Sequence, residues 1–415
     1  MKYLIILGDG MADYPIAELG GKTPLQSAHK PYMDYLAQFG VTGMVQTIPE
    51  GVVHPGSDVA NLSVLGYDPG KYYTGRSPIE AVSMGIKLSK KDTAFRCNLV
   101  TLSDEPDFED KYMIDYSSDE ITTPEAAKII NSLNLMIGSS NMIFYPGVSY
   151  RHCMIWENAP TGFTLVPPHD ILQKCIKPYL PSGSGAAQML TLMHRSSELL
   201  AGHPVNRSRI AKGLKPANSI WLWGEGKKPA IPSFFDKYGV KGSVIAAVDL
   251  IKGLGICAGM NTMKVEGATG NIDTNYEGKA FAALEELDKG QDFVFVHIEA
   301  PDECGHRHEI ENKVKAIEMI DLHVIGPLLK GLDERQNKPG FEDFTIMAVP
   351  DHATPIIMRT HTNDAVPFAI YKKSVAEYSG KDGYDEDSAK TTGIFINKGF
   401  ELMDFFFKFK GQASI

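Results

Sequence analysis

The residues of this sequence best suited to chemistry are Asp and His side chains that follow short apolar segments. Phe344–Val349 is an apolar segment of strand length, and Asp351, His352 and His361 follow it in a turn-rich stretch. A buried strand gives such side chains a rigid base and an open side. One carboxylate and two imidazoles suit a divalent transition metal ion. The pattern predicts a metal site, with a loop of ordinary polar turn residues as the alternative.

Two further apolar segments end in the same way. Tyr3–Leu7 runs into a Gly-Asp-Gly turn that contains Asp9, and its glycines let other groups approach the carboxylate closely. Phe293–Ile298 is followed by Asp302 and His306, which can meet on one ion if a helical turn follows. Taken alone, either pattern is also explained by solvated turn residues.

A serine adds a possible nucleophile to these groups. In residues 54–69, HPGSDVANLSVLGYDP, the Pro55-Gly56 pair breaks the chain and Ser57 is placed to cap a helix over residues 58–65. A hydroxyl at a helix N-terminus faces unpaired N–H groups and the positive end of the helix dipole, where a phosphoryl group is stabilised. An ordinary N-cap is the alternative.

The apolar segments predict strands of one parallel sheet, because they are apolar throughout and therefore suited to burial on both faces. The carboxyl ends of parallel strands meet at one edge, where open α/β sheets bind their ligands. Six oxygen and nitrogen ligands and one hydroxyl could converge there. This set exceeds the needs of one tetrahedral ion and suits two, and paired ions suit in-line displacement at phosphorus.

The elements that must position these residues fall into two predicted domains. Short alternating segments, helix-like stretches over 123–133 and 185–201, and dense Pro and Gly residues predict an inserted α+β domain, residues 81–234. Residues 1–80 and 235–415 would then form a discontinuous metal-binding domain. Within it, Thr23–Phe39 and Lys313–Leu329 each read as one helix.

Composition narrows the class of protein. Of 415 residues, 43% are hydrophobic and 22% charged, which is ordinary for a soluble globular protein. The net charge of -10 argues against nucleic-acid or anionic-membrane partners. Five cysteines without a CxxC pair favour a reducing cytoplasm, and no apolar stretch approaches the ~18 residues of a membrane span. The sequence carries no signal for an oligomeric state.

Beyond these local patterns, the chain resembles a known family nearly from end to end. The segments that carry the resemblance are LGDGM, HPGSDVANLSVLGYDP, YTGRSPIEAVSMGI, NRSRIAKGLKPANSIWLWGEG, VEGATGNIDTNY, VHIEAPDECGH, and PDHATP with the following HT. They resemble the archaeal-type cofactor-independent phosphoglycerate mutases of the alkaline phosphatase superfamily. This resemblance implies an alkaline phosphatase-like, doubly wound α/β core with an insert. It also implies interconversion of 3- and 2-phosphoglycerate through a phosphoserine, without 2,3-bisphosphoglycerate.

The resemblance further implies roles for individual residues. One ion, with Mn²⁺ expected first and Zn²⁺, Mg²⁺ or Co²⁺ as alternatives, would be held by Asp9, Ser57, Asp351 and His352. The second ion would be held by Asp302, His306 and His361, and Ser57 would be the nucleophile.

A small phosphorylated metabolite also needs cations for its anionic groups, and Arg grips such groups bidentately. The candidates are Arg151, His152, Arg207, Arg209 and Lys252. Each is alternatively a partner in an ordinary surface ion pair.

One segment departs from the family pattern. Archaeal members carry an arginine-rich DRRAGR-like segment after an RxNLxT stretch, whereas this sequence has RCNLVT at 96–101 and then DYSSDE at 115–120. A bacterial branch proposed to act as homoserine kinase is closer at this point. A homoserine kinase-like phosphotransferase and a metal-dependent phosphomonoesterase are therefore the alternative functions.

Overall fold

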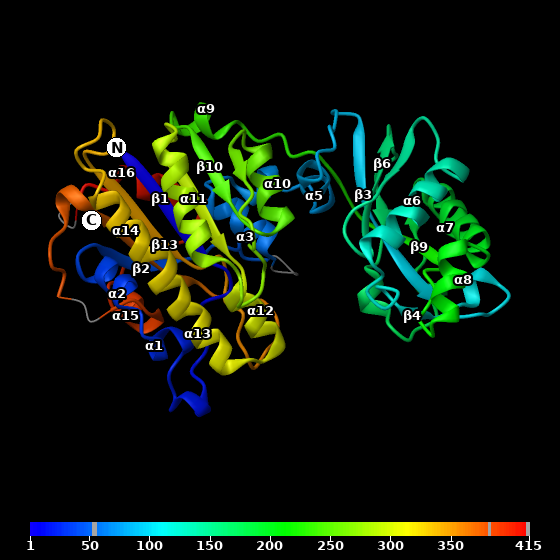
Figure 1. Cartoon of the computed structure of the whole chain (residues 1–415), viewed down its shortest axis with the longest axis horizontal. Coiled ribbons are helices and arrows are strands. Elements are labelled where there is room, and N and C mark those ends of the chain that lie inside the picture. The colour runs from blue at the N-terminus through cyan, green and yellow to red at the C-terminus, as the bar shows by residue number, and fades with distance from the viewer. Residues whose placement is uncertain (52–55, 381–382, 412–415) are drawn as a thin grey trace. The chain divides into compact units, whose positions relative to one another are not determined.

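The computed structural model of this chain describes residues 1–51, 56–380 and 383–411. The chain divides into two compact units, Met1–Tyr73 with Ala230–Ile415, and Thr74–Pro229. We call them the core unit and the inserted unit (Figure 1).

A mixed sheet forms the centre of the core unit. Its strands in the described part of the chain are β1 (Lys2–Gly8), β2 (Val41–Val45), β10 (Gly242–Ile245), β11 (Asn261–Met263), β12 (Phe293–Ile298), β13 (Phe344–Val349), β14 (Val366–Lys372) and β15 (Phe395–Ile396). Their order is β11-β10-β12-β1-β13-β14-β2-β15. The strands from β11 to β13 run parallel, and β14 is antiparallel to both of its neighbours. The predicted parallel strands β1, β12 and β13 thus lie side by side.

Helices cover both faces of this sheet. They are α1 (Pro24–Ser27), α2 (Pro31–Gln38), α3 (Ser57–Val64), α4 (Pro69–Tyr72), α9 (Phe234–Tyr238), α10 (Asp249–Cys257), α11 (Tyr276–Asp288), α12 (Ala300–Arg307), α13 (Ile310–Ile320), α14 (Gly326–Asp333), α15 (Glu386–Lys390) and α16 (Leu402–Lys408). Alternate side chains of β1 point to opposite faces: Leu4 and Ile6 join the core with α2, α11 and α14, whereas Tyr3 packs on Phe406 of α16. The core is therefore doubly wound, as predicted.

The helix predicted over Thr23–Phe39 is wrong, because the structure divides it into α1 and α2. Pro31 begins α2, since proline lacks the N–H of a helix interior and its ring would clash with the carbonyl four residues earlier. Lys313–Leu329 is helical, but a π-helical turn at Asp321–Ile325 separates α13 from α14.

The inserted unit has its own antiparallel sheet and helices. Its elements are α5 (Ser77–Ser83), β3 (Asp92–Leu102), β4 (Met113–Asp115), α6 (Thr123–Met136), β5 (Met142–Tyr145), β6 (Arg151–Glu157), β7 (Phe163–Thr164), β8 (Ser182–Gly183), α7 (Ala186–Ala201), α8 (Pro204–Ala211) and β9 (Ser219–Lys227). Strand β3 pairs with β4, β6 and β9. Leu99, Ile130 and Met193 belong to the apolar core between this sheet and α6 and α7. This is the α+β texture that the sequence predicted.

A buried arginine ties the inserted unit together. Arg209 of α8 is 1% exposed, and its Nη1 donates to Glu125 Oε2 at 2.9 Å. Its Nη2 donates to the carbonyl of Ser118 at 2.6 Å, and its Nε donates to the carbonyl of Lys215 at 3.0 Å. Each of the three nitrogens of this guanidinium is therefore hydrogen-bonded, to α6, to the turn after β4 and to the loop after α8.

That turn needs such support. Ser118, Asp119 and Glu120 have φ angles of 51°, 52° and 49°, a left-handed conformation that costs L-residues ~1–2 kcal/mol each. Lys215 adds a second clamp, because its ammonium group lies 2.7 Å from Asp115 Oδ2 and 2.8 Å from Asp119 Oδ1. Asp115 and Asp119 of the DYSSDE segment are thus both paired with Lys215.

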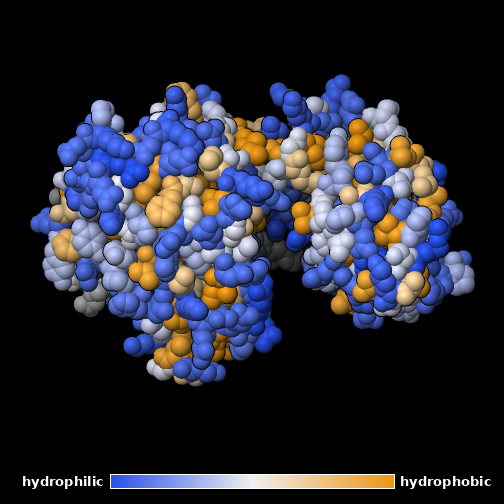
Figure 2. Space-filling model, viewed as in Figure 1, coloured by the Kyte–Doolittle hydropathy of each residue, from blue (hydrophilic) through white to orange (hydrophobic). Residues whose placement is uncertain are grey.

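Surface composition agrees with a globular protein. On the face drawn in Figure 2, hydrophobic residues are scattered among hydrophilic ones. Among the described residues, no helix is both long and apolar enough to cross a membrane.

We predict that Arg209→Met lowers the free energy of unfolding of the inserted unit by ~3 kcal/mol, because it leaves a buried network without its cation. Arg207→Met, two residues away on the exposed side of α8, should change it by less than about 0.5 kcal/mol. All three tryptophans, Trp156, Trp221 and Trp223, lie in the inserted unit, so urea unfolding followed by tryptophan fluorescence reports on it. Equal shifts for the two variants would contradict the assignment.

Candidate metal centre

The carboxyl ends of three neighbouring strands bring the predicted acidic residues together. Asp9 directly follows β1, Asp351 follows β13, and Asp302 lies in the first turn of α12 after β12. These strands are adjacent and in parallel register, with Leu7 paired to both His297 and Val349. All three carboxylates are therefore delivered to one edge of the sheet.

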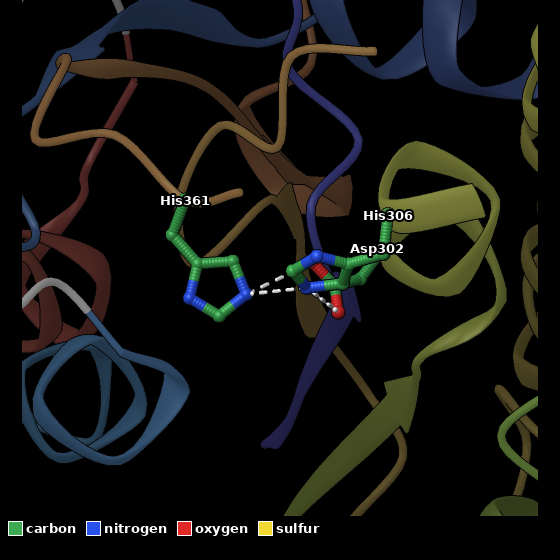
Figure 3. Close-up of side chains that lie close together, drawn as sticks. All are labelled: Asp302, His306 and His361. Carbon is green, nitrogen blue, oxygen red and sulfur yellow. Dashed lines mark hydrogen bonds and ion pairs between the residues drawn. The ribbon is translucent and has the colours of Figure 1, made fainter. Parts of the chain in front are cut away.

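One cluster consists of Asp302, His306 and His361 (Figure 3). The Nε2 atoms of His306 and His361 lie 2.9 Å apart, and each lies 3.3 Å from a different oxygen of Asp302. Asp302 and His306 share α12, four residues apart, as the sequence spacing suggested. Three potential ligand atoms that point at one another from one helix and one loop form a triangular set for an ion.

The tautomer of the neutral His306 ring favours metal binding through Nε2. Its Nδ1 lies 3.0 Å from the carbonyl oxygen of Arg359, which can only accept a hydrogen bond. The neutral ring is thereby held with its Nε2 lone pair toward the cluster. In the metal-free chain, the hydrogen bond with Asp302 raises the pKa of His306 to about 9. Burial opposes ionisation of Asp302, but hydrogen bonds from His306 and His361 outweigh it and lower the pKa of Asp302.

A second cluster forms around Asp9 and includes Asp351 and His352. The Nε2 atom of His352 lies 3.5 Å from Asp9 Oδ1 and 3.3 Å from Asp351 Oδ2. The other carboxylate oxygen of Asp351 accepts the backbone N–H groups of Gly10 and His352 at 3.2 and 2.9 Å. The two clusters adjoin, because the rings of His352 and His361 stack with centroids 3.9 Å apart.

The tautomer of His352 is set by Thr354. The Thr354 hydroxyl donates to Asp302 Oδ1 at 2.5 Å, so its single proton is used there. Its oxygen therefore accepts from His352 Nδ1, 3.2 Å away. Burial lowers the pKa of His352, which leaves the neutral ring with an Nε2 lone pair facing the cluster.

Ser57 faces the same cluster from α3. Its Oγ lies 3.1 Å from His352 Nε2. The prediction that Ser57 caps the helix is wrong: Gly56 is the N-cap and Ser57 is the first helical residue, so its hydroxyl is directed at His352. Asn61, one turn later, donates to both the Ser57 carbonyl and Asp351 Oδ2, at 2.8 and 2.7 Å. His54 and Pro55 of the same motif lie outside the described residues.

These residues fit divalent ions on two observations. Burial and the charges of Asp351 and Asp302 raise the pKa of Asp9 well above its usual range, so the carboxylates repel one another without a cation. Asp9 Oδ1 is also buried with no hydrogen-bond partner among the described residues. Asp9 Oδ1 lies near the Nε2 lone pair of His352. Carboxylate oxygens and imidazole nitrogens together form a ligand set that suits a transition metal ion.

His297 is a site residue that the sequence reasoning missed. It belongs to β12, and its Nε2 lies 3.0 Å from Asp9 Oδ2. Burial lowers the pKa of His297 to about 3, so the neutral ring donates to Asp9 and orients its other oxygen toward His352. The available signal was a lone imidazole within an otherwise apolar strand, Phe293–Ile298.

The predicted substrate-binding residues occupy different environments. Arg151 and Arg207 are exposed, Arg151 lying 5.3 Å from the centre of the Tyr150 ring. His152 is buried; its Nδ1 accepts the N–H of Gly147 at 2.9 Å, and burial lowers its pKa to about 3. The guanidinium of Arg209 is committed to the network described above. Lys252 of α10 in the core unit pairs with Asp249 at 3.1 Å.

Comparison with known proteins relates this chain to one family. A family model described as 2,3-bisphosphoglycerate-independent phosphoglycerate mutase matches residues 37–206, and one described as type I phosphodiesterase / nucleotide pyrophosphatase matches residues 183–376. A Geobacter sulfurreducens protein named "Probable 2,3-bisphosphoglycerate-independent phosphoglycerate mutase" is 50% identical over 404 residues, covering 97% of this chain and 99% of its own. A Methanothrix thermoacetophila protein with the same name, without the first word, is 50% identical over 403 residues, covering 97% and 98%.

Solved structures agree on the fold. A protein from Pyrococcus horikoshii superposes with a TM-score of 0.80 at 30% identity, covering 98% of this chain and 96% of its own. The cofactor-independent phosphoglycerate mutase from Thermoplasma acidophilum superposes with a TM-score of 0.66 at 26% identity, covering 98% and 99%. The predicted alkaline phosphatase-like α/β fold is confirmed.

The raised pKa of His306, about 9, predicts how ion binding depends on pH. Below pH 9 the imidazolium must lose its proton before Nε2 can bind an ion, so binding releases a proton. The affinity of the metal-free chain for Co²⁺ should rise by up to about tenfold per pH unit from pH 6.5 and level off near pH 9. Calorimetry in two buffers of different ionisation enthalpy measures the released protons.

A matched control for this titration is His323→Asn, which removes an imidazole paired with Glu277 on a distant turn. This variant should release as many protons as the wild type. Co²⁺ affinity that does not change between pH 6.5 and 8.5 would contradict the role of His306.

Proposed function

The chain belongs to the 2,3-bisphosphoglycerate-independent phosphoglycerate mutases, and from this we propose that it interconverts 3- and 2-phosphoglycerate through a phosphoserine at Ser57. The observation that carries the proposal is the convergence of Ser57 with His352, Asp9 and Asp351 at the edge of the core sheet. A hydroxyl placed beside paired ion sites is the arrangement that phosphoryl transfer to serine requires.

We assign two divalent ions to the two clusters. Asp9, Ser57, Asp351 and His352 would hold one, and Asp302, His306 and His361 would hold the other. Mn²⁺ is our first choice because carboxylate oxygens suit it. Zn²⁺ and Co²⁺ are the alternatives, since imidazole nitrogens suit transition ions. When bound, such ions lower the pKa of an attacking hydroxyl and neutralise charge on the transferring phosphoryl group.

The residues of the chain then perform a balanced exchange. Ser57 Oγ forms a bond to phosphorus while the bond between phosphorus and the 3-oxygen of the substrate breaks. The serine proton passes to the departing oxygen, which becomes the 3-hydroxyl of glycerate. In the second step the 2-oxygen of glycerate forms a bond to phosphorus while the bond between phosphorus and Ser57 Oγ breaks. The proton of the 2-hydroxyl returns to Ser57, and 2-phosphoglycerate is released. Asn61 holds both the carbonyl of Ser57 and the carboxylate of Asp351, so it keeps nucleophile and ligand in register.

Groups that hold the glycerate moiety are assigned to the inserted unit. Arg151 and Arg207 are the exposed guanidiniums among the predicted residues, and either can bind a carboxylate bidentately. Arg209 is better explained as structural, given its three bonds within the unit. We further propose a cytoplasmic location, on the basis of five cysteines without a disulfide.

One observation favours a second candidate, a homoserine kinase-like phosphotransferase. In the DYSSDE segment, where the family resemblance led us to expect arginines, two carboxylates pair with Lys215. Such a surface suits an acceptor with less negative charge than phosphoglycerate.

The first test is ³¹P NMR of Mn²⁺-loaded protein with 3-phosphoglycerate. We expect metal-dependent appearance of 2-phosphoglycerate and none in a chelated control. Inorganic phosphate alone would indicate a phosphomonoesterase, and a lack of reaction would favour homoserine as acceptor, to be tested with candidate phosphoryl donors.

The second test is Ser57→Ala, which removes the nucleophile. We expect turnover to fall by at least about 10³-fold, because Ser57 carries the hydroxyl that faces His352 Nε2 and would form the phosphoserine. Ion content should persist, since six ligands remain. Ser63→Ala, a buried serine on the same helix, is the matched control and should retain activity. Unchanged turnover in Ser57→Ala would reject the nucleophile assignment.

A further inference from the structure

A lysine is buried beside the candidate metal centre without having been assigned a role. Lys313 lies on α13 and is 0% exposed. Its ammonium group donates to Asp13 Oδ2 at 2.7 Å, to the carbonyl of Thr354 at 2.8 Å and to the carbonyl of Ala12 at 3.4 Å. Burying a charge costs several kcal/mol unless it is paired and hydrogen-bonded. Here three N–H donors meet three acceptors, so the position of each acceptor is constrained.

The acceptors belong to the loops after β1 and β13, which also carry Asp9 and His352. Asp13 strengthens this link, because its two carboxylate oxygens both lie 3.2 Å from the N–H of Ile356 in the second loop. The Asp13 carboxylate is as deeply buried as the ammonium group of Lys313, with side-chain exposures of 1% and 0%. Lys313 and Asp13 together form an ion pair that joins the two loops.

Thr354 connects this ion pair to the predicted ligands. Its carbonyl accepts from Lys313, while its hydroxyl donates to Asp302 Oδ1 at 2.5 Å and accepts from His352 Nδ1 at 3.2 Å. Asp302 and His352 belong to different ion sites. One threonine therefore contacts a ligand of each.

Two glycines pack directly against Thr354. A Cβ atom at Gly10 would lie 2.6 Å from Thr354 Oγ1, and one at Gly305 would lie 2.6 Å from the Thr354 carbonyl oxygen. Gly10 also has a φ of 63°, which L side chains rarely adopt. The backbone thus approaches Thr354 closely on two sides, and Lys313 holds it on a third.

We propose that Lys313 is a positioning residue of the metal centre: acting through Thr354, it holds the Asp302 carboxylate and the His352 imidazole in place for both ions. The inference rests on the proposed function, because it presupposes ions at this centre. Removal of a residue that orients a metal ligand typically lowers metal affinity ten- to hundredfold.

The experiment is a titration of the full-length, metal-free chain with Co²⁺, followed by calorimetry and by the visible absorption of the bound ion. Lys313→Met, which keeps the length of the side chain, should weaken binding of both ions by ten- to hundredfold. The matched control is Lys30→Met, a lysine that is 5% exposed and paired with Asp34 at 2.7 Å. Lys30→Met should bind both ions as the wild type does.

A second pair of variants tests the path through Thr354, and decides the matter if Lys313→Met does not fold. Thr354→Val removes the hydroxyl and keeps the shape, so it should weaken binding of both ions and change the Co²⁺ spectrum. Thr354→Ser restores the hydroxyl and should restore both. The losses of Lys313→Met and Thr354→Val should be less than additive when combined, because they act on one path.

The outcomes separate two failures. A wild-type chain that binds no Co²⁺ would reject the proposed two-ion function itself. A wild-type chain that binds two ions, with folded Lys313→Met or Thr354→Val binding them equally tightly, would overturn only the role of Lys313.

Discussion

Repulsion among three buried carboxylates is the constraint on which the rest of the core unit depends. Asp9, Asp302 and Asp351 are all at most 5% exposed, and they meet at one edge of the sheet. Burial raises the pKa of Asp9 well above its usual range, and the charges of Asp351 and Asp302 raise it further. Such groups persist together only if cations or N–H donors compensate them.

The compensation comes from elements that the hydrophobic core holds in place. Strands β12, β1 and β13 are apolar and buried, and their shared register delivers the three acids to one edge of the sheet. A slip in this register would move the apolar side chains of the strands out of their buried positions. Backbone N–H groups then bind Asp351, and His297 binds Asp9. Among the described residues, Asp9 Oδ1 is left without a hydrogen-bond partner, and the Nε2 atoms of His352 and His306 are turned toward the carboxylates of the cluster. The fold satisfies one side of each ligand and leaves the other side for an ion.

The strand ends that carry the acids could be predicted from the sequence, whereas the side chains that support those acids could not. Continuous apolar segments predicted β1, β12 and β13, because burial on both faces has a direct compositional signature. His297 escaped notice because the direction of one side chain on a central strand depends on its neighbours. Arg209 was predicted to bind substrate, with a surface ion pair as the alternative, because its partner Glu125 lies 84 residues away in the sequence. Local propensity also missed the break before Pro31, where a single residue overrides an otherwise helical pattern.

Charge accounting in the inserted unit bears on the choice of substrate. Asp115 and Asp119 share the single ammonium group of Lys215, and hydrogen bonding with Lys215 and Ser117 outweighs burial to lower the pKa of Asp115. Lys215 therefore offsets one of these two negative charges and leaves the other. In 3-phosphoglycerate the phosphoryl group would be compensated at the ions, which leaves one carboxylate to be bound. A single guanidinium satisfies a carboxylate with two parallel hydrogen bonds. In the proposed mutase, one guanidinium would therefore be enough for the carboxylate of the glycerate, and the exposed side chains of Arg151 and Arg207 are the proposed candidates.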